Sequence, residues 1–259
     1  MRNDKLLAGI GSLALLVAFL AAWQWMPGLM KMPAFILPNL SQTVAAGYRM
    51  WTSGGLLMNT GVTALEIVAG FVLGSLLGVF IGVILGLSRT AESVLSPYIL
   101  ALQISPKVAF APLFVIWLGF TVYPRILVAV LIVFFPVLIN VLTAVKNTDP
   151  DMINLVRTLN GSRLTVFRLV EFPAALPALF SGLRIGSTLA VVGVTVGELV
   201  GGNRGLGVLL VQGEGQGDTA AVFVTIVMLT LIGILAYGAV VFLEGRVLHY
   251  MPRASQGQA

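Results

Sequence analysis

The chain has 259 residues, of which 58% are hydrophobic and only 10% are charged, and its formal net charge is +5. Charged residues make up about a quarter of ordinary soluble chains, so this composition excludes a soluble domain and indicates an integral membrane protein. The chain has no cysteine, which excludes a disulfide framework, a thiolate nucleophile and a cysteine-ligated metal site. Its basic residues are scattered around apolar runs, so membrane orientation explains the net charge better than a nucleic-acid partner does.

The first apolar run covers residues 6–26, about 31 Å as a helix, which is enough to cross a hydrocarbon core of about 30 Å. Arg2 and Lys5 precede it and are expected on the cytoplasmic side. A signal peptide is the competing interpretation, but the run is long and no small-x-small cleavage site follows. Residues 27–58 are expected outside the membrane, with the amphipathic piece 40–51 lying at the interface.

The second span, residues 59–87, carries a glycine at every fourth position. Such a ladder allows another helix to approach backbone to backbone, so we predict a helix-packing face. Its members are Gly70, Gly74, Gly78, Gly82 and Gly86. Glu66 lies near the outer end of this span, where it would face either a pore or the membrane interface, and the interface is the preferred interpretation.

The third span, residues 93–120, is too long for one straight helix across the membrane. Ser105-Pro106-Lys107 divides it, and we predict a break near 105–107 because proline lacks a backbone donor and pushes the preceding residue toward extended geometry. Lys107 then lies at a broken helix. Either it marks a translocation path, or it extends to the cytoplasmic surface.

A short external turn with Tyr123, Pro124 and Arg125 leads into the fourth span, residues 126–146. The longest polar passage of the chain follows, and we call residues 147–173 the elbow. Asp149-Pro150 predicts a turn, residues 151–159 a short helix, Asn160-Gly161-Ser162 a break, and residues 163–171 a second helix that ends before Pro173.

The fifth span, residues 174–200, contains polar side chains on one side. At 100° per residue, four of them fall within about 80° of one another on a helix. They are Arg184, Thr188, Thr195 and Glu198. This polar stripe indicates either hydrogen bonding between helices or a solute path.

The glycine-rich segment 201–218 is predicted to be an external loop, either a flexible gate or a re-entrant loop. It contains neither a phosphate-binding loop nor a dinucleotide-binding fingerprint. The last span covers residues 219–243, which gives six spans with both termini in the cytoplasm. The positive-inside rule supports this orientation and places the elbow in the cytoplasm. The expected cytoplasmic cations are Arg2, Lys5, Arg89, Lys146, Arg157, Arg163, Arg168, Arg246 and Arg253, and the expected external ones are Lys31, Arg49, Arg125 and Arg204.

The elbow resembles the EAA loop of permease subunits in bacterial ABC importers, whose pattern is E-A-A, three residues, a glycine, nine residues, then I-x-L-P. Asn154-Leu155-Val156, Asn160 and Val170-Glu171-Phe172-Pro173 stand at the matching positions. The spacing is kept, although the letters differ. Asparagine is the non-glycine residue that best tolerates a positive φ, so the turn can survive at Asn160.

The resemblance extends over nearly the whole chain. Pro106 to Leu113, Ala174 to Arg184 and Gly197 to Gly207 are similar to segments of the nitrate/sulfonate/taurine permease family. Within that family, the Pro-Lys-Val-Ala and Asn-Arg-Gly-Leu-Gly variants are similar to members that import heterocyclic vitamin precursors such as pyrimidines or riboflavin.

The resemblance implies an all-α integral membrane chain with the type I ABC importer permease fold, in the bacterial cytoplasmic membrane. It implies a homodimer, two cytoplasmic ATPase subunits docked on the elbows, and an external solute-binding protein that delivers a small molecule. ATP and magnesium would bind the ATPase, and this chain would bind no metal or cofactor and contain no catalytic residue. The coupling residues implied are Asp151, Asn154, Leu155, Val156, Arg157, Thr158, Leu159, Asn160, Gly161 and Pro173.

Two other functions remain as alternatives. A self-contained secondary transporter or channel would pass solute without an ATPase, but six spans without an obvious internal repeat argue against it. An intramembrane enzyme would need a catalytic set, and the single histidine, the absence of cysteine and the lack of G-x-S-x-G do not supply one. The solute stays open. Lys107 and Arg184 would suit an anion, whereas Phe110, Phe114 and Trp117 would suit a planar heterocycle.

Overall fold

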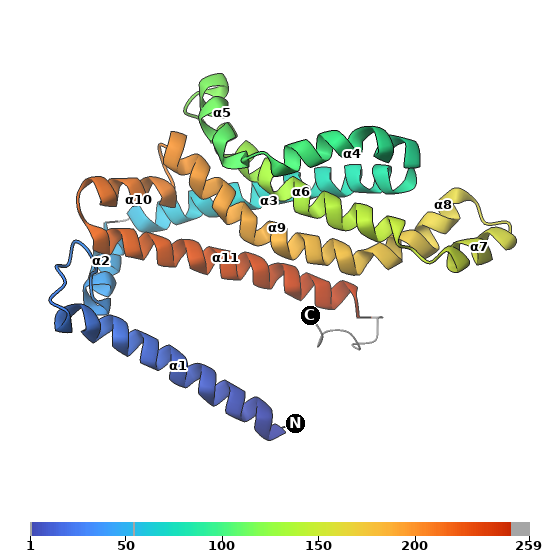
Figure 1. Ribbon diagram of the computed structural model, residues 1–259. Coiled ribbons are helices and arrows are strands. Elements are labelled where there is room, and N and C mark those ends of the chain that lie inside the picture. Colours follow the sequence, from blue (N-terminus) through green and yellow to red (C-terminus); the bar gives the residue numbers. More distant parts are fainter. Residues whose placement is uncertain (1, 54, 250–259) are drawn as a thin grey trace. The chain divides into compact units, whose positions relative to one another are not determined.

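The computed structural model describes residues 2–53 and 55–249, with the side chains of residues 2–6 and 8 excepted. Arg253, and the side chains of Arg2 and Lys5, therefore lie outside the described part of the chain. Every regular element within 2–53 and 55–249 is a helix, which confirms the all-α prediction (Figure 1). Five of these helices are long and apolar enough to cross a membrane, and a bent pair makes a sixth span if it is counted as one.

The helices have the following bounds, where η1 is a 3-10 helix and η2 is a π-helix. They are α1 (Arg2–Leu29), α2 (Leu40–Thr52), α3 (Gly55–Leu87), α4 (Arg89–Ile104), η1 (Lys107–Phe110), α5 (Ala111–Leu118), α6 (Val122–Lys146), α7 (Pro150–Thr158), α8 (Arg163–Val166), η2 (Phe167–Glu171), α9 (Phe172–Gly201), α10 (Leu206–Gly215) and α11 (Thr219–Val247).

The chain divides into two compact units. The first contains the residues up to Val62 together with Arg204–Leu229, and the second contains Thr63–Asn203 together with the residues from Thr230 onward. In the first unit, the indole of Trp23 in α1 donates to the carbonyl of Pro38 (3.0 Å) and its ring lies 5.6 Å from that of Phe223. These contacts hold α1 to the segment that precedes α2 and to the beginning of α11.

The segment 201–218 is not a loop throughout, contrary to the prediction, because α10 occupies its centre. The glycines at its edges suggested a loop, but the apolar run that starts at Leu206 is helical and Leu206 is fully buried. Gly205 precedes α10 with a φ of +120°, a conformation that favours glycine. Its N–H donates to the side-chain oxygen of Asn59 in α3 (2.6 Å), which satisfies a backbone donor at the helix start.

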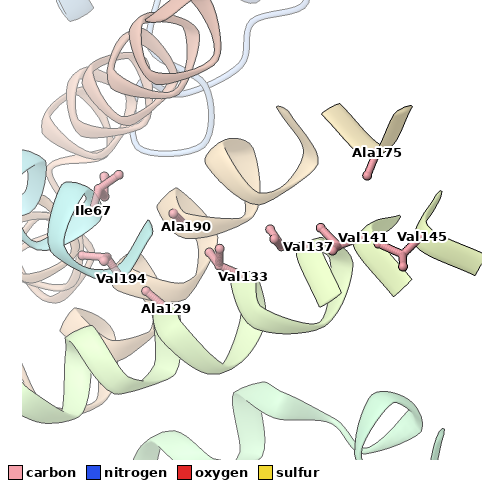
Figure 2. Close-up of a cluster of buried hydrophobic side chains, with 9 residues drawn as sticks. All are labelled: Ile67, Ala129, Val133, Val137, Val141, Val145, Ala175, Ala190 and Val194. Carbon is pink, nitrogen blue, oxygen red and sulfur yellow. The ribbon is translucent and has the colours of Figure 1, made fainter. Parts of the chain in front are cut away.

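In the second unit, α6 lies between two rows of glycines. The structure places all five predicted packing glycines of α3 against α6, where a Cβ at any of them would come within 2.5–2.9 Å of an α6 atom. Because no side chain fits there, the two backbones meet directly. Valines and an alanine of α6 occupy the contact, and Figure 2 shows them with residues of α3 and α9: Ile67, Ala129, Val133, Val137, Val141, Val145, Ala175, Ala190 and Val194.

The second glycine row belongs to α9 and was not predicted. Cβ atoms on Gly193 and Gly197 would lie 2.6 Å from the Cα atoms of Ala129 and Arg125 in α6. Farther along the same helix, Cβ atoms on Gly182 and Gly186 would each lie 3.1 Å from a side-chain atom of α6. Helices α3, α6 and α9 therefore form one closely packed block, which we call the three-helix block.

The predicted third span is bent. Helix α4 begins at Arg89, ends at Ile104 and is followed, after Ser105-Pro106, by η1 and α5, with an angle of 85° between the two parts. No residue of α4 is buried within the chain. The bend coincides with the proline, whose missing N–H and whose effect on the preceding residue both oppose a continuous helix.

Candidate functional site

The first half of the elbow is a short capped helix. Asp149 precedes α7 and its carboxylate accepts from the N–H of Asp151 (2.9 Å), while Pro150 occupies the first turn, where a missing N–H costs nothing. The helix starts one residue before the predicted 151 and ends at Thr158. None of its residues is buried, and within the second unit α7 projects beyond the ends of α6 and α9 (Figure 1).

The turn after α7 has the backbone geometry that its two central residues predict. Asn160 has a φ of +57°. Its N–H donates to the carbonyl of Arg157 and the N–H of Gly161 donates to that of Val156, both at 2.9 Å. This pair of bonds is a Schellman motif, which satisfies the last carbonyls of a helix. A Cβ on Gly161 would lie 2.5 Å from a methyl group of Val156, so glycine is required there for space.

The second half of the elbow differs from the prediction. Ser162 caps α8 by accepting from the N–H of Thr165 (3.2 Å), but the helix does not end before Pro173. It continues through the π-helix η2 into α9, so that 163–201 is one unbroken helical path. A π turn widens the backbone directly ahead of Pro173, where the proline ring would otherwise meet the carbonyl four residues earlier.

The elbow presents apolar side chains without cover from the described residues. Leu155, Leu159 and Leu164 are 56%, 75% and 55% exposed, and Met152 is 50% exposed. Polar and charged residues stand among them, and of the coupling residues only Val156, Gly161 and Pro173 are partly buried. An exposed apolar surface with polar and charged neighbours is typical of a site that contacts another protein or a membrane.

Two polar contacts hold the elbow end of the three-helix block. The guanidinium of Arg163 donates to the carbonyl of Leu87, the last residue of α3 (2.5 Å). This places a positive charge at a helix C-terminus, where the helix dipole favours it. Lys146, at the end of α6, pairs with Glu92 in α4 (2.6 Å).

Each of the five predicted translocation-path residues has a polar partner within this chain. Arg184 pairs with Glu244 at 3.5 Å. The hydroxyls of Thr188 and Thr195 donate to carbonyls of their own helix, at 2.9 and 2.8 Å. Lys107 donates to the carbonyl of Gln103 (2.5 Å) at the end of α4 and lies 4.8 Å from the ring centre of Phe135. Lysine thus caps the broken helix, a role that neither sequence interpretation included.

The fifth, Glu198, belongs to a group of buried polar side chains that we call the buried ionic cluster: Thr63, Glu66, Arg125 and Glu198. The hydroxyl of Thr63 in α3 donates to the carboxylate of Glu198 in α9 (2.6 Å). The guanidinium of Arg125 in α6 lies 3.1 Å from the carboxylate of Glu66 in α3. The cluster therefore connects all three helices of the three-helix block.

Two sequence expectations are corrected here. Glu66 is 4% exposed and pairs with Arg125 inside the chain, and Arg125 is 2% exposed and helical rather than part of a turn. Arg125 lies in the first turn of α6, where Gly197 of α9 leaves room for it. The signal available in the sequence was the presence of opposite charges in apolar spans, since such charges are expected to pair.

Elsewhere, the first unit contains a pocket of about 290 Å³ between α2 and the turn from α10 to α11. Arg49 and Asp218 pair across it at 3.6 Å. No predicted site residue lines this pocket. Among residues 2–53 and 55–249, no group of three or more histidine, aspartate or glutamate side chains is arranged to hold a metal ion.

Comparison with known proteins identifies relatives over most of the chain. The family model described as binding-protein-dependent transport system inner membrane component matches residues 70–249. A riboflavin transport system permease protein of Chloroflexus aurantiacus is 40% identical over 86% of this chain and 83% of its own length. A putative aliphatic sulfonates transport permease protein of Bacillus subtilis is 31% identical over 92% and 86%. A formylaminopyrimidine transport permease protein of Halalkalibacterium halodurans is 36% identical over 61% and 63%.

Proposed function

We propose, because this chain belongs to the family of inner membrane components of binding-protein-dependent transport systems, that it forms the solute path of an ATP-driven importer. It is a multi-pass membrane protein, and its relatives are permeases by name. We place it in the inner membrane of a bacterium with both termini in the cytoplasm. Two copies would pair, and each would bind one ATPase subunit.

The observation that carries this proposal is the exposed helix α7. Met152 and Leu155 of α7 are 50% and 56% exposed, and the elbow is attached at both of its ends to the three-helix block through α6 and α9. A separate cytoplasmic ATPase would receive α7, with ATP and magnesium bound by that subunit. This chain would supply no catalytic group.

Transport would proceed by alternating access. Closure of the ATPase pair on ATP would move α7, and the Schellman turn at Asn160 would pass that movement to α8 and η2 without a flexible joint. Because the helical path continues into α9 and α9 packs directly on α6, the three-helix block would then move as a unit. A binding protein would deliver the solute from outside.

For the solute, we propose a planar heterocyclic compound of the kind named for the relatives from Chloroflexus aurantiacus and Halalkalibacterium halodurans. The two cations that an anion would use, Arg184 and Lys107, both already have partners. Phe110, Phe114 and Trp117 instead form a row with successive ring centres 6.1 Å apart. Aromatic rings bind planar rings by stacking.

The test is uptake by proteoliposomes that contain this chain, its ATPase and its binding protein. We expect uptake of labelled riboflavin or a formylaminopyrimidine, but not of an alkyl sulfonate. Uptake should require ATP on the side of the membrane that carries the ATPase. Sulfonate uptake under the same conditions would overturn the solute proposal alone. Uptake by this chain without ATPase or binding protein would favour a secondary transporter or channel.

A further inference from the structure

The buried ionic cluster lies at one end of the three-helix block and the elbow at the other. Along α6, Arg125 and Lys146 are separated by about 32 Å at 1.5 Å per residue, close to the thickness of a hydrocarbon core. Lys146 leads into the elbow, and α9 leaves it toward Glu198. A movement that begins at α7 therefore reaches the cluster only after crossing the whole block.

Packing already holds this block together without the cluster. Glycines of α3 and α9 contact α6 backbone to backbone along most of its length. Buried ion pairs contribute little net stability, and apolar residues of similar volume often replace them without loss. Such pairs do fix geometry, since the atoms of a hydrogen bond or an ion pair must meet at a defined distance and angle.

Two contacts of the cluster join different helices, while Arg125 also donates to the carbonyl of Thr121 at the start of its own helix (3.3 Å). Thr63 joins α3 to α9, and Glu66 and Arg125 join α3 to α6. By contrast, other buried hydroxyls bond within their own helix, as Ser187 does to the carbonyl of Arg184 (2.8 Å). The cluster thus adds interhelical contacts of defined geometry to helix surfaces that otherwise pack through glycines and apolar side chains.

We propose that the buried ionic cluster is a positioning site that fixes the ends of α3, α6 and α9 opposite the elbow, so that docking of the loaded binding protein and movement of the elbow remain coupled. The inference rests on the proposed function. The residues of the cluster do not contact solute, and they act through the arrangement of the three helices.

The decisive variant is the double substitution E66L/R125M, which removes both charges and keeps apolar volume. We expect the complex with the ATPase to assemble, with basal ATP hydrolysis unchanged. The acceleration of hydrolysis by loaded binding protein should fall about tenfold, a common size for a coupling between two sites. Acceleration equal to wild type would mean that the pair only fills space, and would overturn the proposal.

A second, milder comparison keeps the proposal testable if the double variant does not assemble. T63V removes the hydroxyl that joins α3 to α9, and S187A removes a hydroxyl that bonds only within α9. We expect T63V to lower the acceleration by binding protein about fivefold, at the lower end of ordinary couplings, and S187A to leave it unchanged. Equal results for the two variants would contradict the inference.

The wild-type complex separates this inference from the function on which it rests. If the wild-type chain does not co-purify with an ATPase subunit, the proposed function and the positioning role are both wrong. In the other case, the wild-type complex forms and loaded binding protein accelerates its ATP hydrolysis. If the same acceleration is then measured for T63V and for E66L/R125M, the proposed function stands and only the positioning role is wrong.

Discussion

The charged residues at the two ends of the three-helix block differ in their burial and in their partners. At the end formed by Glu66, Arg125 and Glu198, the charges are buried and joined across helices. At the elbow end, the ion pair of Lys146 with Glu92 is partly exposed, and the exposed leucines of the elbow are Leu155, Leu159 and Leu164. One end of the block has its charges paired within the chain, whereas the other presents exposed apolar side chains, which we propose bind the ATPase.

This difference indicates where the molecule tolerates change. A substitution that leaves one charge of the buried end without its partner should appear first as a loss of stability. Under the proposed function, a substitution at the elbow should leave the block intact and weaken its contact with the ATPase. The predictions below test this contrast, beginning with the largest expected effect.

The single variant R125M should be the most damaging. It leaves Glu66 buried without the cation it faces, and breaking a buried ion pair in this way costs about 3–5 kcal/mol. We expect a large drop in the thermal unfolding midpoint of the purified chain. The double variant E66L/R125M is the control and should recover most of the loss. Equal destabilisation by both would show that the charges are not energetically linked.

Gly78→Ala should be the next most damaging. A Cβ there would lie 2.8 Å from the carbonyl oxygen of Phe134 in α6, and overpacking of this kind costs about 1–3 kcal/mol. Gly61 lies in the same helix with nothing within 4 Å of the position its Cβ would take, so G61A is the matched control. Thermal unfolding should separate the two variants; similar midpoints would argue against close packing of α3 on α6.

At the elbow, Asn160→Val should act on coupling rather than on the fold of the block. The left-handed conformation costs an L-residue about 1–2 kcal/mol, and a branched side chain resists it further. We expect N160V to assemble less ATPase and to lose ATP-driven uptake, with the unfolding midpoint little changed. N160G fits the same turn and should behave as wild type. Normal uptake by N160V would show that the left-handed turn at Asn160 is not required for coupling.

The smallest effect is expected for Glu92→Gln at the partly exposed pair with Lys146. Exposed ion pairs contribute about 1 kcal/mol or less, and salt screens them. The unfolding midpoint should therefore change little and should be insensitive to the substitution at high ionic strength. A drop in the unfolding midpoint as large as that of R125M would contradict the proposed difference between the two ends.

Local features of this fold were predictable from sequence because each depends on neighbouring residues. The break at Ser105-Pro106 follows from proline geometry, and the positive φ at Asn160 follows from the tolerance of asparagine for that conformation. The glycine ladder of α3 was visible because its period matches one helix face.

The features that sequence missed depend on contacts between distant segments. Arg125 follows Tyr123 and Pro124 and so suggested an external turn, but Gly197, far along the chain, admits it to the interior. The glycine row of α9 was obscured by the polar stripe on the same helix. The π turn before Pro173 was missed because proline predicts the end of a helix, whereas this helix continues through Pro173. Helix α10 was hidden because the glycines around it outweighed its apolar centre.

The central claim is that the elbow docks on a separate ATPase, and site-specific cross-linking tests it most directly. The chain contains no cysteine, so Leu155→Cys introduces a single thiol on exposed α7. In membranes containing the assembled complex, a reagent that joins this thiol to nearby lysines should yield an adduct with the ATPase, in an amount that changes on addition of ATP. Ile234→Cys, 61% exposed within the apolar helix α11, is the control and should yield none. Absence of an ATPase adduct at position 155 in an assembled, active complex would contradict the account.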